Sequence, residues 1–379
     1  MCIRDRLFDC ANAQMATGDH GNANRTFERL QKECPDWPQI NDVVRLRAVC
    51  LHQLHEFESS LAQCDKFLAD AVGHTAYPDA AFLRVENLFL LARDAEAMEA
   101  YRAFIAKYGD SRYVGTAHMR VAQLLHKQGK WELALKELER LKGRPTDDPI
   151  FNQVDFIAGD CHYQLSDWDN ALAALGRFLQ RFGGEANADA ATLKVGLSHA
   201  AKGDRDQAVR MLSHLVRQFP KFEHIHVALA ELGRLQYEAG RCQEARTSLQ
   251  RVTREVPKGR TRALAEYYLG WTALKESQPD TALAHFANVS SKFPEADLLP
   301  DALLQQATIL LEKKDVPRAQ ALLDRFVKDH ADDEKFDHAV FYLGVSLARQ
   351  KRWPDAAKRF KQVVDMADKT DLRDRALYE

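Results

Sequence analysis

Residues 228–257 read ALAELGRLQYEAGRCQEARTSLQRVTREVP, with apolar residues at helical spacing on either side of Gly240. In the second half, Ala245 and Leu249 lie four residues apart, so both fall on one face of a helix with about 3.6 residues per turn. Gly240 suits the turn between two helices because glycine adopts positive φ without a Cβ penalty. Pro257 ends the second helix because proline lacks a backbone N–H. The stretch therefore predicts a helix–turn–helix unit.

The same unit recurs with a period of 37 residues. A small residue marks each copy and defines position 0; these anchors are Ala23, Ser60, Ala97, Ala134, Ala171, Ala208, Ala245, Ala282, Ala319 and Ala356. Position +4 holds Phe27, Cys64, Tyr101, Leu138, Leu175, Leu212, Leu249, Phe286, Leu323 and Phe360. Position +7 holds Leu30, Phe67, Phe104, Leu141, Phe178, Leu215, Val252, Val289, Phe326 and Val363. These positions share one helix face, so we expect the second helix of each unit to bury this stripe.

Other positions of the unit are restricted to small or helix-breaking residues. Position −12, in the first helix, is Gly or Ala in every copy except the third, which has Val85. We expect the two helices to approach closely at this point. Position −5 is glycine in four copies (Gly18, Gly129, Gly203 and Gly240), and position +12 is Pro or Gly in six. These breakers predict two helices of about 13–16 residues in each unit.

A single helix pair cannot bury both of its faces, but stacked pairs form a continuous core. We therefore predict an all-α, right-handed superhelical solenoid of about ten repeats, which fill residues 1–370. We expect residues 371–379 to begin an eleventh repeat, because Arg-Ala-Leu at 375–377 matches Arg-Ala-Leu at 262–264. We interpret the chain as a fragment that is open at both ends.

Small residues at −12 and 0, a bulky residue at +4 and proline at +12 form a pattern that resembles the tetratricopeptide repeat family. The period of 37 departs from the usual length of about 34 residues in this family. Helix ends such as Phe219-Pro220 and Phe293-Pro294 are similar to those of bacterial envelope members, including the periplasmic coordinator of the Tol–Pal system and the helical lipoprotein of outer-membrane barrel assembly. The resemblance implies a non-catalytic protein that binds a protein or peptide along a concave groove lined by the first helices.

Composition and motifs exclude several other classes of function. The chain has 53 Lys and Arg against 55 Asp and Glu, a net charge of −2, so it lacks the basic balance of a nucleic-acid-binding protein. No apolar run reaches the roughly 18–20 residues that span a bilayer. The sequence contains no phosphate-binding loop, no nucleophile elbow and no zinc-binding His or Cys motif, so we predict no catalytic residue, cofactor or metal.

The residues best suited to binding lie at positions −15, −11 and −8 of the first helices. These positions share one helix face and resemble the groove-lining positions of the family. Position −11 holds side chains as different as those of Asp160 and Trp271, and packing alone does not require such a mixture. Aromatic and arginine side chains at these positions are natural anchors for a peptide. The candidate groove residues are Glu86, Gln123, His126, Asp160, Tyr163, Arg234, Tyr237 and Trp271. The alternative is that positions −15 and −8 belong to the core between repeats.

Four interpretations of function remain open. The subgroup resemblance favours a scaffold in a bacterial cell-envelope assembly, whereas seven cysteines that need not pair favour a cytoplasmic adaptor. A third interpretation makes the repeats the regulatory arm of a larger enzyme whose catalytic domain lies beyond residue 379, and a fourth makes them a structural spacer. A chaperone clamp is disfavoured, because only Asn12 matches its Lys and Asn pattern and Phe8 stands in place of the Lys.

Overall fold

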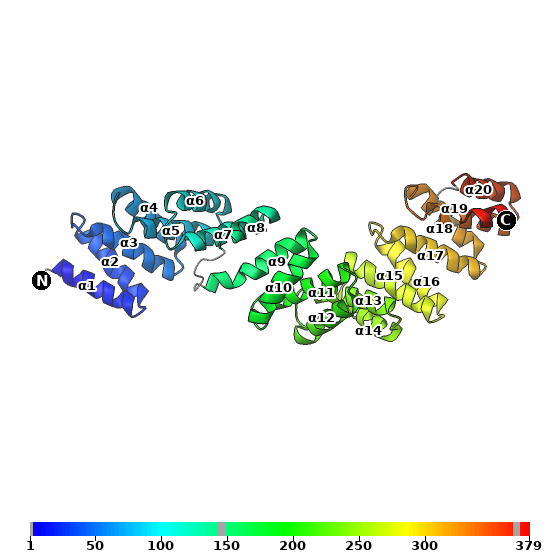
Figure 1. Ribbon diagram of the computed structural model, residues 1–379, viewed down its shortest axis with the longest axis horizontal. Coiled ribbons are helices and arrows are strands. Elements are labelled where there is room, and N and C mark those ends of the chain that lie inside the picture. Colours follow the sequence, from blue (N-terminus) through cyan, green and yellow to red (C-terminus); the bar gives the residue numbers. More distant parts are fainter. Residues whose placement is uncertain (1–2, 142–148, 367–371) are drawn as a thin grey trace. The chain divides into compact units, whose positions relative to one another are not determined.

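The computed structural model describes residues 3–141, 149–366 and 372–379, and within these ranges it contains helices and no strand (Figure 1). The predicted all-α helical repeat fold is confirmed. The chain divides into two compact units, Met1–Gly184 and Glu185–Glu379. The boundary falls close to the expected end of the fifth repeat.

The first unit consists of helices that mostly have 14 residues, within the predicted range. In its described residues they are α1 (Ile3–Ala16), α2 (His20–Glu33), α3 (Ile40–Gln53), α4 (Phe57–Asp70), α5 (Tyr77–Leu90), α6 (Asp94–Lys107), α7 (Val114–Lys127), α8 (Trp131–Glu139), the 3-10 helix η1 (Pro149–Gln153), α9 (Val154–Gln164) and α10 (Trp168–Phe182). Helices α8 and α9, which flank residues 142–148, are shorter than predicted, with 9 and 11 residues.

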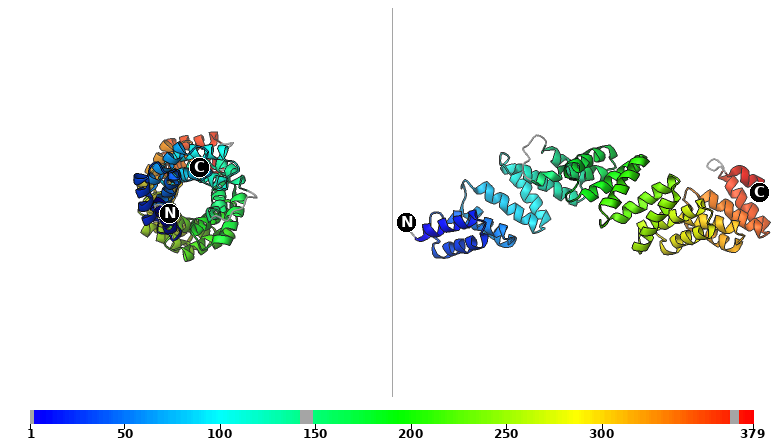
Figure 2. Two further views of the ribbon diagram at one scale, coloured as in Figure 1. Left: turned by 90° about the vertical axis from the view of Figure 1, so that its left-hand side faces the viewer. Right: turned by 90° about the horizontal axis from the view of Figure 1, so that it is seen from below.

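The second unit repeats the same arrangement. Its described helices are α11 (Ala188–Ala201), α12 (Arg205–Gln218), α13 (Ile225–Glu238), α14 (Cys242–Glu255), α15 (Arg260–Lys275), α16 (Pro279–Lys292), α17 (Leu299–Glu312), α18 (Val316–Asp329), α19 (Phe336–Arg349), α20 (Trp353–Asp365) and α21 (Arg373–Tyr378). Within each unit, helices that follow one another in the chain pack side by side (Figure 2). The odd-numbered helices are the first helices of the expected repeats, and the even-numbered helices are the second.

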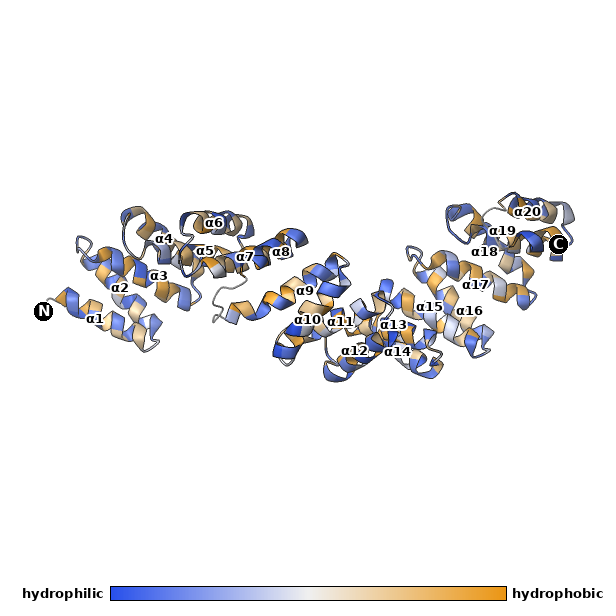
Figure 3. Ribbon diagram, viewed as in Figure 1, coloured by the Kyte–Doolittle hydropathy of each residue, from blue (hydrophilic) through white to orange (hydrophobic). Residues whose placement is uncertain are grey.

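The second helices bury the stripe at positions 0, +4 and +7. The ten anchors are at most 2% exposed, and every residue at +4 and +7 is buried as well. Individual helices therefore carry apolar and polar residues together, as the alternating colours in Figure 3 show. Burial of such a stripe against the neighbouring helices is the main source of stability for helices of this length.

Glycine at position −12 allows the two helices of a repeat to touch. A Cβ atom placed on Gly159 of α9 would lie 2.5 Å from Cγ of Leu175 in α10, and one placed on Gly233 of α13 would lie 2.5 Å from Cγ of Leu249 in α14. Both contacts are far shorter than the roughly 3.5–4.0 Å at which carbon atoms attract one another. The small residue at −12 and the large residue at +4 are thus complementary surfaces of one helix pair.

The turn between the two helices has positive φ at position −5 in all ten copies, although only four of them have glycine there. The other six copies place a residue with a Cβ in this left-handed conformation: His55, Ala92, Ser166, Ser277, Lys314 and Lys351. The conformation costs an L-residue about 1–2 kcal/mol. The surrounding helix pair thus imposes the turn even where the local sequence does not favour it.

A further column of small residues lies in the first helices at position −17 and was missed by sequence reasoning. It comprises Val43, Ala80, Ala117, Val154, Ala191, Ala228, Ala265, Ala302 and Ala339, of which all but Val154 are buried. Within a unit, a first helix packs against the second helix before it as well as the one after it, as α3 does against α2 and α4 and α13 does against α12 and α14. First helices therefore need small residues on two faces, at −17 and at −12.

The tail corrects one prediction. The N-cap of α21 is Leu372, which lies 37 residues after Lys335, the N-cap of α19. Ala376 therefore continues the column at −17 and is buried, whereas the prediction aligned it with Ala263. The Arg-Ala-Leu string occurs at both places but at helix positions that differ by two residues, so this part of the alignment was wrong; that residues 371–379 begin an eleventh repeat stays a prediction.

Candidate functional site

The structure places all eight predicted groove residues on first helices, divided between the two units. Helix α5 carries Glu86, α7 carries Gln123 and His126, α9 carries Asp160 and Tyr163, α13 carries Arg234 and Tyr237, and α15 carries Trp271. Five of them belong to the first unit and three to the second. Each unit therefore carries its own group of candidate residues.

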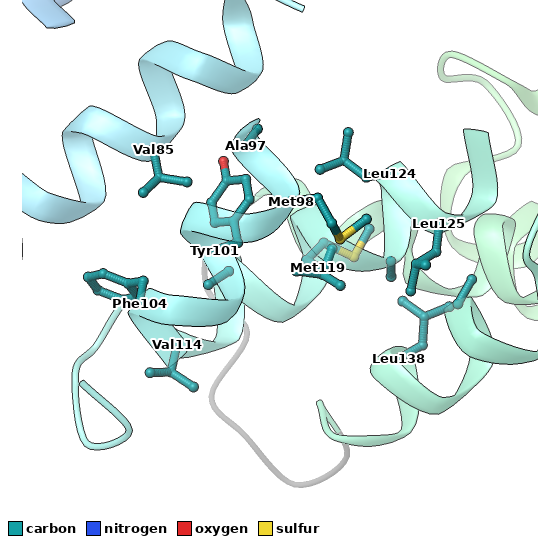
Figure 4. Packing of buried hydrophobic residues seen from close by; sticks show 14 of the residues in the cluster. Val85, Ala97, Met98, Tyr101, Phe104, Val114, Met119, Leu124, Leu125 and Leu138 are labelled. Carbon is teal, nitrogen blue, oxygen red and sulfur yellow. The ribbon is translucent and has the colours of Figure 1, made fainter. Parts of the chain in front are cut away.

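Glu86 connects neighbouring repeats of the first unit. Its side chain is only 13% exposed, and its two carboxylate oxygens accept hydrogen bonds from Nε and Nη2 of Arg120 in α7 at 3.1 and 2.9 Å. The hydroxyl of Tyr101 in α6 donates to Oε1 of the same carboxylate. Figure 4 shows the ring of Tyr101 among buried apolar side chains, with its hydroxyl directed towards Val85 and Ala97. Burial, with the charge of Glu86, raises the pKa of Tyr101 well above its usual range.

The next two first helices of this unit are linked in the same way. Nε2 of His126 in α7 lies 2.7 Å from Oδ2 of Asp160 in α9, a carboxylate only 7% exposed. Because a carboxylate only accepts, Nε2 carries the proton of this bond. Gln123 donates to the side-chain oxygen of Gln153 at 3.2 Å. Tyr163 packs edge-on against Trp168 at 5.5 Å between ring centres. Glu86, Gln123, His126 and Asp160 thus hold contacts between neighbouring repeats, whereas Tyr163 packs within its own helix pair.

A pocket of about 390 Å³ lies between α3 and α5, and we call it the α3–α5 pocket. Its wall includes residues at positions −15, −11 and −8, the face on which the candidate groove residues were chosen, and these are Arg45, Val49, His52, Phe82 and Glu86. Leu83 adds an apolar side chain, and Arg112 and Tyr113 close the end towards α7. The pocket combines an apolar wall with charged groups, as is typical of sites that bind an extended segment.

Arg45 is the charged group of this pocket with the fewest polar contacts. Its Nε is buried and has no hydrogen-bond partner, and its Nη2 lies 3.4 Å from Oδ1 of Asp42, a long contact. By contrast, Asp79 accepts from Nη2 of Arg112 at 3.1 Å, and Glu86 is bound as described above. Sequence reasoning did not single out Arg45. The signal was available, because Arg45 is the one charged residue among the ten at position −15.

In the second unit, Arg234 is held by acidic residues of its own helix. Its Nε lies 3.0 Å from Oε2 of Glu231, and its Nη1 also contacts Glu238. The hydrogen bond to Glu231 is the largest cause that raises the pKa of Arg234. The guanidinium is therefore already neutralised within α13.

The aromatic candidates of the second unit pack against other rings. The ring of Tyr237 lies 5.7 Å from that of Tyr268, and Nζ of Lys275 lies 5.2 Å from its centre. Trp271 lies 5.9 Å from Phe286, the core residue at +4 of the same repeat. Trp271 thus forms part of the packing of its own helix pair, whereas Tyr237 contacts the neighbouring first helix through Tyr268.

Neither a metal centre nor a membrane crossing emerges from the described ranges. They contain no cluster of three or more His, Cys, Asp or Glu side chains suited to a metal ion. None of their helices combines the length and apolar character that crossing a bilayer requires.

Comparison with known families supports the resemblance found in the sequence. Residues 228–259 match the tetratricopeptide repeat family, so this resemblance is confirmed, and the chain has the helical repeat fold of these proteins. Residues 261–374 match YfiO, described as an outer membrane lipoprotein. Residues 87–233 match the N-terminal domain of the ESX-1 secretion system protein EccA1. Curated protein sequences give no match.

Several solved structures are similar to this chain. The hetero-tetramer Cut9–Hcn1 of the APC/C has 12% identity, with 99% of this chain and 89% of that chain covered and a TM-score of 0.46. PilF of Pseudomonas aeruginosa has 15% identity, with coverages of 58% and 93% and a TM-score of 0.47. YrrB, described as a tetratricopeptide repeat protein with an unusual peptide-binding site, has 15% identity, with coverages of 55% and 98% and a TM-score of 0.44.

Proposed function

We propose that this protein is a non-catalytic scaffold that binds an extended segment of a protein partner along its first helices, with the α3–α5 pocket as a principal contact. The observation that carries the proposal is the pocket itself, which is open on the face where positions −15, −11 and −8 of two successive repeats converge. Tetratricopeptide folds are typical of protein-interaction scaffolds, and the family match supports the same class. The proposal takes residues 1–370 as ten repeats and 371–379 as the start of an eleventh.

The composition of the pocket supports a peptide as its occupant. Val49, Phe82 and Leu83 supply apolar contact area, while Arg45 and His52 supply polar groups that fix the orientation of a bound segment. Glu86, Gln123, His126 and Asp160 act in this proposal mainly by holding successive first helices in register. Arg234, Tyr237 and Trp271 are proposed as a second contact region within the second unit.

The family matches support a role in a bacterial cell-envelope assembly. One match is described as an outer membrane lipoprotein and another as the N-terminal domain of a secretion system protein. We therefore propose that the partner belongs to an assembly in the bacterial cell envelope. A second candidate is that the repeats form the docking arm of a longer protein, which the match to an N-terminal domain favours.

The proposed function is tested by selection of peptides on the full chain. A library of random peptides displayed within a loop of a carrier protein is selected on the wild type, and binding of the selected peptides is measured by calorimetry. Val49→Glu places a charge on the apolar wall and is expected to weaken binding at least roughly tenfold. The matched control is Val72→Glu, because Val72 is 82% exposed in the α4–α5 connection and should tolerate the change. Failure to select any binder, or binders indifferent to Val49→Glu, would overturn the proposal.

A further inference from the structure

The α3–α5 pocket contains a positively charged group whose hydrogen-bonding capacity is not used. The side chain of Arg45 is 24% exposed, so most of its surface is withdrawn from water. Its Nε has no hydrogen-bond partner. A guanidinium can donate five hydrogen bonds, and a buried donor without a partner costs about 1–3 kcal/mol. A ligand that accepts hydrogen bonds from this guanidinium would supply partners that the protein itself does not provide.

The acceptors that already line the pocket do not supply this partner. Asp79 is engaged with Arg112, and both oxygens of Glu86 are engaged with Arg120. Oδ1 of Asp42 lies between Nη2 of Arg45 at 3.4 Å and Nε2 of His74 at 3.7 Å, so it holds neither group closely. The carboxylates of the site are therefore committed to other cations or are distant, and Arg45 remains under-satisfied.

His52 also offers a ring nitrogen that can bind a ligand in this pocket. Nδ2 of Asn87 donates to Ser60, so Oδ1 of Asn87 is left to accept from Nδ1 of His52 at 2.7 Å. Nδ1 of His52 thus carries a proton, and Asn87 fixes the orientation of the ring. In the neutral ring Nε2 is an acceptor, and in the charged ring it becomes a second donor. The side chains that retain capacity for a ligand are consequently Arg45, His52 and the exposed Arg112.

We propose that the α3–α5 pocket accepts an acidic side chain of the bound segment, whose carboxylate pairs with the guanidinium of Arg45. This inference rests on the proposed function and names the chemistry of the partner. A carboxylate matches the planar fork of a guanidinium with two parallel hydrogen bonds. The apolar wall of Val49 and Leu83 then contacts a neighbouring apolar residue of the segment. The recognised element is an aspartate or glutamate beside an apolar residue within an extended chain.

The experiment uses the peptides selected on the full chain, made synthetically with acetylated and amidated ends so that they carry no terminal charge. Each peptide is compared with a form in which its Asp or Glu is replaced by Asn or Gln. Binding is measured to the wild type, to Arg45→Gln and to a matched control, Arg84→Gln. Arg84 lies in α5, whereas Arg45 lies in α3; Arg84 lines a different pocket and pairs with Asp65 at 2.5 Å. Circular dichroism of each variant verifies that it is folded.

The expected result is a loss of affinity of roughly 10- to 100-fold when either Arg45 or the peptide carboxylate is neutralised, because a hydrogen bond to a charged group is worth about 1.5–3 kcal/mol. Neutralising both should cost little more than neutralising one, and Arg84→Gln should have no effect.

Three outcomes would overturn this inference. In the first, the selected peptides lack acidic residues; in the second, they bind Arg45→Gln as tightly as the wild type. In the third, binding depends on a free C-terminal carboxylate instead. If such peptides still lose affinity with Val49→Glu, the inference fails while the proposed function stands. If no peptide is selected at all, both fail.

Discussion

Gly159→Ala tests how the two helices of a repeat are matched. The new Cβ would lie 2.5 and 2.8 Å from Cγ and Cδ2 of Leu175, and 3.0 Å from its backbone nitrogen. The side-chain atoms can move by rotation, but the backbone of α10 can move only if the helix shifts. We therefore expect α9 and α10 to separate slightly and the first unit to lose stability.

The magnitude follows from two opposing effects. Overpacking a core by a methyl group costs about 1–3 kcal/mol, whereas alanine is favoured over glycine in a helix interior by about 1 kcal/mol. Because part of the clash involves backbone, we expect the cost to lie at the upper end, for a net loss of about 1–2 kcal/mol. The matched control is Gly176→Ala in α10, where a Cβ meets nothing within 4 Å. This change should stabilise the protein by about 0.5–1 kcal/mol.

The assay is urea unfolding of the full chain followed by circular dichroism, with amide hydrogen exchange of α9 and α10 to locate the effect. The account predicts opposite signs for Gly159→Ala and Gly176→Ala, and faster exchange only in the first. Shortening the facing side chain provides a further test. The double variant Gly159→Ala with Leu175→Ala should lose less stability than the sum of the two single variants, because the cavity left by the shortened Leu175 accepts the new methyl group. Equal stabilisation by both glycine substitutions would refute the claim of a tight helix contact.

Other expected outcomes concern the turns, the buried acid and the second unit. Ala92→Gly should stabilise the protein by about 0.5–1 kcal/mol and Gly203→Ala should destabilise it by about 1 kcal/mol, because both occupy the positive-φ turn; urea midpoints measure both. Although burial acts to raise it, side-chain hydrogen bonds hold the pKa of Glu266 below its ordinary 4.5. The stability advantage of the wild type over Glu266→Gln should therefore be full above pH 4.5 and diminish as the pH falls below it, in urea midpoints measured across this range. Tyr237→Ala combined with Trp271→Ala should weaken binding of a segment held by the second unit without unfolding it, and calorimetry with an unchanged affinity would indicate a purely structural role.

The repeat and its buried stripe could be predicted from the sequence because they depend on local periodicity. Small and large apolar residues at fixed spacing specify which face of each helix is buried, and this pattern can be read without knowing which helix packs against that face. The positive φ of His55 and Lys314 could not be predicted, since their residue types do not favour this conformation and the helix pair imposes it. The role of the column at −17 could not be predicted, because it depends on a first helix packing against the second helix before it, and this contact appears only in the structure.

The candidate site was less accessible to sequence reasoning. Position −11 was singled out for its variety of residues, but Glu86 and Asp160 prove to bind Arg120 and His126 of neighbouring repeats. Such pairings depend on which side chains face each other across two helices, and the sequence contains no local signal for them. Arg45 differs, because a charge in an apolar column is visible in the sequence, but its missing hydrogen-bond partner is visible only in the structure.

The central claim is that a peptide lies on the first helices of the first unit, and amide hydrogen exchange with and without a selected peptide tests it most directly. The account predicts slower exchange in α3, in α5 and at the start of α7, with α4 and α6 unchanged. Protection confined to the second helices, or no protection at saturating peptide, would contradict it.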